Sequence, residues 1–308
     1  MGNTVIARIE QALVQHLALS GGPSAPPRLM AAMGHAVFPG GARIRPQLCV
    51  AVARACGQDA PELTDAAAVA LEFMHCASLV HDDMPCFDDA DTRRGLPTVH
   101  KQFGEPLALL TGDALIVAAY QTLVRAGAAH PQRLVGLLEL LGEGVGAPSG
   151  IVAGQAWECE TRADLGQYQR AKTGSLFVAA TCSGALSAGA DPEPWQALGE
   201  CLGEAYQVAD DIRDVIGEAQ ALGKPVGQDA QHARPSVAHA LGLGGAITYF
   251  EYLIQRAVDA VPKGPSSEAL QQIVRQESER LVPSSTCVAY RHSNVGLVNQ
   301  AGGQHATT

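Results

Sequence analysis

At positions 81–89 the chain reads His81-Asp82-Asp83-Met84-Pro85-Cys86-Phe87-Asp88-Asp89, at the end of an otherwise apolar helical run. In a continuous helix Asp82 and Asp88 would lie on different sides. Pro85 disfavours helical geometry at Met84 and helps to end the helix there. The sequence therefore predicts a loop that returns Asp88 towards Asp82, although a plain acidic loop without a function would show the same residues.

A second acidic cluster, Asp210-Asp211-Ile212-Arg213-Asp214, lies inside another apolar helical run. Asp210 and Asp214 share a helix face, and Gln207 joins it one turn earlier. Carboxylates packed this densely repel one another, so they are stable together only when cations neutralise them. Because Mg²⁺ is normally held by one or two carboxylates plus substrate phosphates, the pattern favours a metal site over a solvated acidic helix face.

Basic residues accompany both clusters: Arg93 and Arg94 follow the first, and Lys224 follows the second. A further basic segment, Gly40-Gly41-Ala42-Arg43-Ile44-Arg45-Pro46, leads into a helix. Flexible glycines, two guanidiniums and a proline in the first helical turn suit anion capture at a helix N-terminus, although this motif alone is weak. Acid for metal beside base for phosphate indicates a site that handles diphosphates.

Apolar residues recur at helical spacing along nearly the whole chain, with no sustained alternation of period two. The fold class that we predict is all-α: a single large helical bundle around a central apolar cavity, over residues 1–282. Residues 283–308 form a mobile tail of Ser, Asn, Gly and Gln. After an opening amphipathic helix, the expected helices are 28–38, 46–55, 63–84, 107–126, 132–141, 150–161, 165–188, 194–216, 236–241, 245–261 and 267–281.

Composition limits the class of partner. The 308 residues are 47% hydrophobic and 17% charged, with a net charge of −10, which argues against nucleic acid or an anionic membrane as the main partner. The eight cysteines are scattered, which is typical of reduced thiols in the cytosol. No signal peptide is evident, and Asp113 interrupts the most apolar stretch, 107–124. We therefore expect a soluble, cytoplasmic protein that is not an integral membrane protein.

The order of the motifs, from about residue 38 to 235, resembles that of the trans-isoprenyl diphosphate synthases, or polyprenyl synthetases. The nearest likeness is to the bacterial geranylgeranyl diphosphate synthases of carotenoid and bacteriochlorophyll pathways. The motifs that carry the resemblance are Asp82-Asp83-(four residues)-Asp88, Arg93-Arg94-Gly95, Lys172-Thr173-Gly174, Gln207-Val208-Ala209-Asp210-Asp211-Ile212-Arg213-Asp214 and Leu222-Gly223-Lys224-Pro225.

The resemblance implies an isoprenoid-synthase fold, a homodimer, and Mg²⁺ as cofactor, with three ions when substrate is bound. The substrates would be isopentenyl diphosphate and an allylic diphosphate: dimethylallyl, geranyl or farnesyl. It implies metal ligands at Asp82, Asp88, Asp210 and Asp214, with Asp83, Asp211 and Lys172 also catalytic. The allylic diphosphate would be held by Arg93, Lys172, Thr173, Gln207 and Lys224, and isopentenyl diphosphate by Arg45, His75 and Arg94.

One position departs from the family pattern. The first basic loop of the family usually reads Gly-Gly-Lys-Arg, and here Ala42 stands at the lysine position. One cation for isopentenyl diphosphate is therefore missing, and we expect either weaker binding of that substrate or its replacement by Arg43. Arg234 is the candidate for a second family lysine beyond Lys224.

The helix before Asp82 sets the expected product length. In the family, a bulky aromatic residue five positions before the first aspartate stops growth at farnesyl diphosphate; here that position is Ala77. Phe73 and Met74, about a turn further back, are large enough to form the floor. Geranylgeranyl diphosphate is thus the expected product, unless Ala77 merely packs against a neighbouring helix.

Other functions remain open at this stage. A farnesyl diphosphate synthase differs only in product length. A class I terpene cyclase has no second diphosphate to bind, so Arg45 and Arg94 count against it. A non-catalytic subunit that modulates an active synthase tends to lose an aspartate motif, whereas both persist here.

Overall fold

The computed structural model describes residues 2–38, 40–147, 149–161, 170–221, 237–264, 266–285 and 287. Within them the chain is all-α, as predicted, apart from one small hairpin. The elements are α1 (Gly2–Gly21), α2 (Pro27–Val37), α3 (Ile44–Ala55), α4 (Pro61–Asp82), β1 (Thr92–Arg93), β2 (Leu96–Pro97), α5 (Val99–Phe103), α6 (Glu105–Gly127), α7 (Pro131–Val145), α8 (Ile151–Trp157), the π-helix η1 (Arg170–Gly174), α10 (Ser175–Ser187), the 3-10 turn η2 (Glu193–Trp195), α11 (Gln196–Ala221), α12 (Val237–Asp259) and α13 (Ser267–Leu281).

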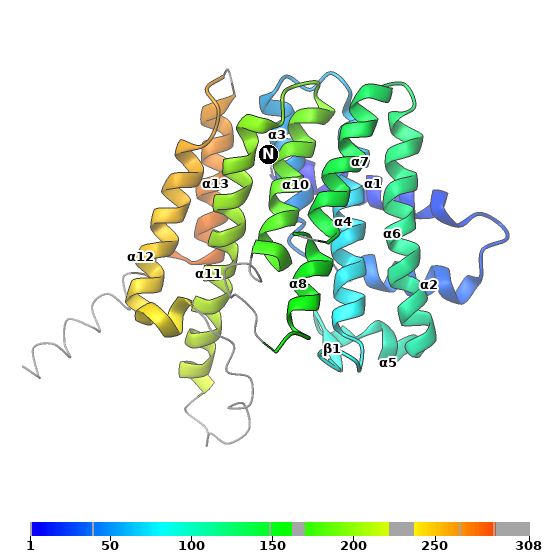
Figure 1. Cartoon of the computed structure of the whole chain (residues 1–308), viewed down its shortest axis with the longest axis horizontal. Coiled ribbons are helices and arrows are strands. Elements are labelled where there is room, and N and C mark those ends of the chain that lie inside the picture. Colours follow the sequence, from blue (N-terminus) through cyan, green and yellow to red (C-terminus); the bar gives the residue numbers. More distant parts are fainter. Residues whose placement is uncertain are drawn as a thin grey trace, which may run out of the picture.

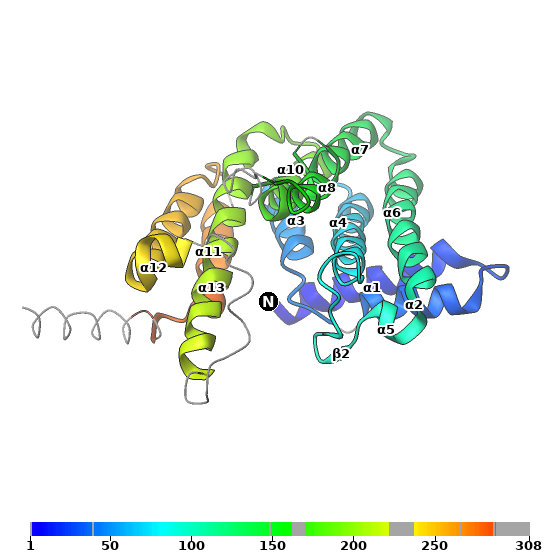
Figure 2. The same ribbon diagram turned by 60° about the horizontal axis from the view of Figure 1, so that its bottom comes forward.

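Helices α4 and α10 form the centre of the bundle. Helix α10 is apolar on all sides and packs against α3, α4, α7 and α11, while α4 packs chiefly against α6. In Figure 1, α6 and α7 lie to one side of this centre and α11, α12 and α13 to the other. Figure 2, turned by 60°, keeps the same order. A helix without a polar face is buried, which explains the place of α10.

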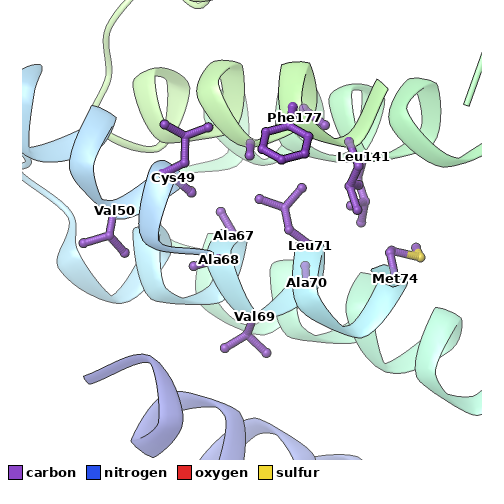
Figure 3. Close-up of a cluster of buried hydrophobic side chains, with 14 of the residues drawn as sticks. Cys49, Val50, Ala67, Ala68, Val69, Ala70, Leu71, Met74, Leu141 and Phe177 are labelled. Carbon is purple, nitrogen blue, oxygen red and sulfur yellow. The ribbon is translucent and has the colours of Figure 1, made fainter. Parts of the chain in front are cut away.

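The core between α4 and α10 combines large side chains with many alanines. Figure 3 shows Leu71 of α4 pointing towards Phe177 of α10, with Ala67 and Ala68 about one turn earlier in α4. Leu71 and Phe177 are each 1% exposed. Gly184 lets α10 approach α3 closely, since a Cβ there would lie 2.5 Å from the carbonyl oxygen of Cys49. Small residues thus bring the central helices together, and burial of the large ones stabilises the contact.

Two expected helices, 236–241 and 245–261, are one element. The structure merges them into α12, with a single non-helical residue at Gly242, where φ is 69°. Only glycine adopts this left-handed conformation without strain, so the interruption kinks the helix. Helix α12 packs on α11, where Phe250 and Leu253 meet Ile212 in a second apolar cluster.

The sequence pattern did not predict the hairpin. Strands β1 and β2 pair antiparallel, with Thr92 opposite Pro97 and Arg93 opposite Leu96. Arg94 and Gly95 make the turn, with positive φ values of 55° and 79°. Strands of two residues are too short to show alternation, which is why periodicity missed them.

A buried ion pair joins α4 to the start of α3. The Arg43 side chain donates from Nη1 to Glu72 Oε1 at 2.6 Å and from Nε to Glu10 Oε1 of α1 at 2.7 Å. Its Nη2 donates to the Val37 carbonyl at 2.7 Å. Arg43 and Glu72 are each 2% exposed, so each charge depends on the other for compensation.

Two of the described helices, α4 and α6, are long and apolar enough to cross a membrane by length and composition. The expectation that Asp113 would disqualify the 107–124 stretch is therefore wrong on that criterion. In the bundle, 78% of the apolar window of α4 is buried, which marks α4 as a core helix. Only 44% of the α6 window is buried, so one face of α6 is left uncovered.

Removal of Glu72 should destabilise the protein strongly. Glu72→Ala leaves the buried guanidinium of Arg43 with a single carboxylate, at an expected cost of about 3 kcal/mol or more in the free energy of unfolding. Glu62→Ala is the matched control, because Glu62 is an exposed carboxylate in the first turn of the same helix. Urea unfolding followed by circular dichroism measures both. Equal losses in the two variants would show that the buried pair has no special importance.

Candidate active site

Helix α4 ends where the sequence predicted, at the first aspartate cluster. Its last residue is Asp82, and Asp83 is its C-cap. The Asp88 N–H donates to the Asp82 carbonyl at 2.9 Å, and the Ala90 N–H donates to the Asp83 carbonyl at 3.2 Å. These bonds fold the loop back on the helix end and confirm the predicted return of Asp88 towards Asp82.

Both oxygens of the Asp82 carboxylate have partners from the neighbouring segment. Gln155 of α8 donates to Oδ1 at 3.0 Å, and Lys172 Nζ of η1 lies 3.3 Å from Oδ2. Burial raises the pKa of Asp82, and the Lys172 ammonium opposes this rise. Desolvation disfavours the ionised form of this carboxylate, and the nearby ammonium favours it.

Asp83 is engaged differently. Its carboxylate accepts two bonds from Arg93 Nε, each of 2.8 Å, and one from Nη2 at 2.6 Å. This bidentate pair raises the pKa of Arg93 and occupies both carboxylate oxygens. The Asp83 carboxylate thus fixes the orientation of Arg93, and its catalytic role stays a prediction.

The second cluster lies in the middle of α11. Asp210 pairs with Arg213 on the same helix, and Asp214 is exposed. Burial raises the pKa of Asp210, against the effect of Arg213. Asp211 points elsewhere: it accepts from Gln207 Nε2 at 3.1 Å and from the Val237 N–H at 2.8 Å. Asp211 thus holds Gln207 and the start of α12, and its catalytic role stays a prediction.

The Lys-Thr pair connects the two clusters. Lys172 and Thr173 lie in the π-helix η1, a form common at functional sites because it changes the direction of side chains within a helix. While Lys172 reaches Asp82, the Thr173 hydroxyl donates to Gln207 Oε1 of α11 at 3.1 Å. The structure therefore brings Lys172, Thr173 and Gln207 together between the two acidic clusters, as a shared site requires.

The three residues predicted for isopentenyl diphosphate lie near one another. Arg45 stacks on Phe177, with Cζ 4.7 Å from the ring centroid, and its Nε is buried without a hydrogen-bond partner. Arg94 donates to the Gly40 carbonyl and lies against Gly41. Burial lowers the pKa of His75 well below 6.5, and the charges of Arg45, Arg94 and Arg93 lower it further. Several cations around a neutral imidazole make this region suited to an anion.

Arg43 does not belong to this pocket. Its three donor groups bind Glu10, Glu72 and the Val37 carbonyl. The left-handed conformation at Arg43, where φ is 49°, accompanies this inward direction. The suggestion that Arg43 replaces the missing lysine is corrected accordingly, and its predicted substrate-binding role becomes a structural one.

The donor set fits Mg²⁺. Within the described part of the chain, no group of three or more His, Cys, Asp or Glu side chains converges closely enough to hold an ion by itself. Mg²⁺ needs no such cage, because it keeps several waters and takes one or two carboxylates plus substrate phosphates. Both acidic clusters supply carboxylates of that kind. Asp82 and Asp88 lie at the end of α4 and in the loop after it, and Asp210 and Asp214 lie on α11. Such an ion would stabilise negative charge on a departing diphosphate.

The chain-length residues are packed tightly. Phe73, Met74 and Ala77 are at most 1% exposed and belong to the main core. A cavity of about 550 Å³ lies elsewhere, between α7, η1, α10, α11 and α12, and none of its lining residues comes from α4. The expected opening down α4 is therefore not preformed as part of this cavity.

Two of the predicted residues are not described by the structure, and two residues at the site were not predicted. Lys224 and Arg234 lie outside the described residues. Gln155 and Glu158 were not predicted, although Glu158 Oε1 lies 2.7 Å from Lys172 Nζ. Sequence reasoning missed both residues because they lie far along the chain from Asp82. The sequence signal for them was a polar pair at the end of an apolar helix.

Comparisons with known proteins identify the family of the chain. The family model for polyprenyl synthetase matches residues 26–257, so the chain belongs to the polyprenyl synthetase family. It is 52% identical over 277 residues to the geranylgeranyl diphosphate synthase of Cereibacter sphaeroides, covering 90% of this chain and 96% of that protein. With the geranylgeranyl diphosphate synthase of Rhodobacter capsulatus it shares 49% identity over 280 residues, or 90% and 97% of the two chains.

Relatives at lower identity include one that is named for a different product. The farnesyl diphosphate synthase of Geobacillus stearothermophilus is 37% identical over 260 residues, covering 81% of this chain and 86% of that protein. Among solved structures, the geranyltransferase of Helicobacter pylori complexed with magnesium and isoprenyl diphosphate superposes with a TM-score of 0.72 at 28% identity, covering 87% and 95% of the two chains. The geranyltransferase of Legionella pneumophila gives a TM-score of 0.78 at 26% identity, covering 92% and 96%.

Restoring a lysine at position 42 should strengthen substrate binding. Since Arg43 is fully engaged, Ala42→Lys adds a cation beside Arg94, and we expect KM for isopentenyl diphosphate to fall by about tenfold, the effect of one charge-assisted hydrogen bond. An unchanged kcat would mark uniform binding. Ala42→Met is the control of similar length without charge. Equal KM values for the lysine and methionine variants would mean that Arg45, His75 and Arg94 already satisfy the diphosphate.

Proposed function

We propose that this protein is a Mg²⁺-dependent geranylgeranyl diphosphate synthase, which condenses isopentenyl diphosphate with dimethylallyl, geranyl or farnesyl diphosphate. The proposal includes three ions in the substrate complex and a cytoplasmic location. Two relatives named for this activity match the chain over nearly its whole length at about half identity. The side chains of Cys49, Cys56, Cys76, Cys86, Cys159, Cys182 and Cys201 are free thiols, which supports a reducing compartment.

The observation that carries the proposal is the presence of two separate anion sites. One lies between the acidic clusters, where Lys172, Thr173 and Gln207 meet. The other is formed by arginines around His75, including Arg45 with its buried, unpartnered Nε. A reaction between two diphosphates needs both, and a buried guanidinium donor without a partner is costly unless a ligand completes it.

The alternatives fit these observations less well. A class I terpene cyclase binds one diphosphate and has no use for the pocket around His75. A non-catalytic subunit has no need of two intact aspartate clusters, each with basic residues nearby. A farnesyl diphosphate synthase has the same two sites, and only the depth of the prenyl pocket distinguishes it.

The residues of the site divide the chemistry between them. Lys172, Arg93 and Gln207, with Lys224, hold the allylic diphosphate and stabilise the charge that grows on it as the C–O bond ionises. The apolar core beyond the cleft keeps water from the allylic cation. Arg45, His75 and Arg94 hold isopentenyl diphosphate so that its double bond attacks that cation. The proton then lost passes to the released diphosphate, so no side-chain nucleophile is required.

The direct test feeds radiolabelled isopentenyl diphosphate with each allylic primer in turn. Incorporation into longer prenyl diphosphates that stops on addition of EDTA and in Asp82→Ala is the expected result. Cyclised products from geranylgeranyl or farnesyl diphosphate alone would support a cyclase. Activity only after a second polypeptide is added would support the subunit.

We further propose a homodimer through the uncovered face of α6. Leu110, Val117 and Val124 recur at heptad spacing along this helix and are 50%, 53% and 50% exposed. A straight apolar stripe on a long helix is complementary to a second copy of itself about a two-fold axis. In this proposal the exposed part of the apolar window of α6 is buried against a partner subunit and not against lipid.

A charge in the α6 stripe should separate the subunits. Val117→Lys buries an unpaired ammonium in the interface, and we expect light scattering after gel filtration to shift from dimer to monomer mass. Val135→Lys is the control, because Val135 of α7 is equally exposed, at 57%, and lies outside the stripe. A wild-type monomer, or a Val117→Lys variant that stays dimeric, would contradict the interface.

The position of Ala77 should control product length. Ala77→Tyr places a phenol beside Phe73 and Met74, so that growth stops at farnesyl diphosphate, as judged by chromatography of dephosphorylated products. Met74→Ala should shift products in the opposite direction, to longer chains, because Met74 is the more adaptable side chain of the floor. Circular dichroism confirms that both variants fold. A wild-type enzyme that already stops at farnesyl would refute the pocket depth.

A further inference from the structure

Helix α8 contacts Asp82, and the residue that follows this helix contacts Lys172, although none of the motifs that carry the family resemblance includes these two segments. Gln155 is 8% exposed and lies in α8, whereas Asp82 ends α4. Glu158 is the C-cap of α8 and lies beside Lys172. Figure 1 shows α8 beside the lower part of α4, next to the end that carries Asp82.

The amide of Gln155 has one possible orientation. Its Nε2 donates to Asp82 Oδ1 and to the Ser78 carbonyl, each at 3.0 Å. Ser78 and Asp82 are one turn apart on α4, so the amide bridges the last turn of the helix. The reverse orientation would set the amide oxygen against a carbonyl and a carboxylate, both acceptors, and is therefore excluded. The bond to the Ser78 carbonyl holds the Gln155 amide against the helix, and the bond to Oδ1 then restrains the rotamer of the Asp82 carboxylate.

Close packing holds α8 in register with η1. A Cβ at Gly154 would collide with the backbone of Lys172, so only glycine permits this approach. The contact places Gln155 and Lys172 on the two oxygens of the same carboxylate. Neither side chain can drift far without moving the backbone of its own segment.

Glu158 gives Lys172 a second anionic partner. Lys172 Nζ lies 2.7 Å from Glu158 Oε1 and 3.3 Å from Asp82 Oδ2, so the ammonium is shared and lies closer to Glu158. Both carboxylates are largely buried, at 18% and 9% side-chain exposure. If Asp82 held a metal in place of Lys172, Glu158 would keep the Lys172 ammonium beside the site.

We propose that Gln155 and Glu158 are positioning residues for the metal cleft, a role that rests on the proposed function. Gln155 sets the rotamer of Asp82 and leaves Oδ2 for the metal. Glu158 draws Lys172 away from that oxygen and holds it for the diphosphate. Partners of a metal-ligating carboxylate commonly change metal affinity or activity by about 10- to 100-fold when removed.

The first experiment replaces Gln155 by methionine, which keeps the length and removes both donors. Calorimetric titration of Mg²⁺ in the presence of inorganic pyrophosphate measures metal binding without turnover. We expect the apparent Mg²⁺ affinity of Gln155→Met to fall by about tenfold or more, and the Mg²⁺ concentration for half-maximal rate to rise in parallel. KM for isopentenyl diphosphate, which binds at Arg45, His75 and Arg94, should stay the same.

Gln102→Met is the matched control, since Gln102 is an exposed glutamine of α5 outside the cleft. If Gln155→Met lowers the melting temperature but leaves Mg²⁺ affinity at the wild-type value, Gln155 is merely structural and the proposal fails. Wild-type protein that binds Mg²⁺ and pyrophosphate without prenyl transfer would refute the proposed function instead, while the calorimetry would still decide the role of Gln155.

The second experiment tests Glu158. Glu158→Gln keeps the shape but lets Lys172 pair more strongly with Asp82, so Mg²⁺ affinity should fall severalfold. In a Lys172→Met background the same substitution should have no effect on Mg²⁺ binding, since no ammonium remains to compete. Glu160→Gln, at an exposed carboxylate two residues on, controls for the change in net charge. Equal effects of Glu158→Gln with and without Lys172 would overturn the assigned competition.

Discussion

The contact between Lys172 and Asp82 joins the two sides of the cleft, and the rest of the site is built on it. It ties the end of α4 to the π-helix η1. From there hydrogen bonds continue through Thr173 to Gln207 of α11, and from Gln207 through Asp211 to the first residue of α12. Four segments far apart in the sequence are thus connected by one polar chain across an apolar bundle. Such a chain is specific in geometry because each buried member depends on its neighbours.

Carboxylates of both acidic clusters are paired with basic side chains. Asp82 has Lys172, Asp83 has Arg93, and Asp210 has Arg213. Each pair offsets part of the repulsion between carboxylates that burial would otherwise force towards protonation. The bases are the same groups that a diphosphate requires.

The sequence predicted those features that depend on neighbouring residues. Helical spacing gave the bundle, and Pro85 gave the loop that returns Asp88 to Asp82. It did not predict features set by partners distant along the chain. The hairpin strands are too short for a period, and the pairing of Asp83 with Arg93 joins residues ten positions apart. Gln155 was missed because its role arises only where α8 meets α4, 73 residues away.

The two arginines beside Ala42 show why residue type alone does not assign a function. Arg43 and Arg45 are two positions apart and carry the same charge, but the left-handed turn at Arg43 directs one inward. Glu72 then binds Arg43 directly, while Arg45 stacks on Phe177 and keeps a buried Nε without a partner. A core carboxylate that satisfies the first guanidinium thereby leaves the second available. The inward direction of Arg43 thus goes with its ion pair to Glu72, whereas Arg45 keeps a donor for another partner.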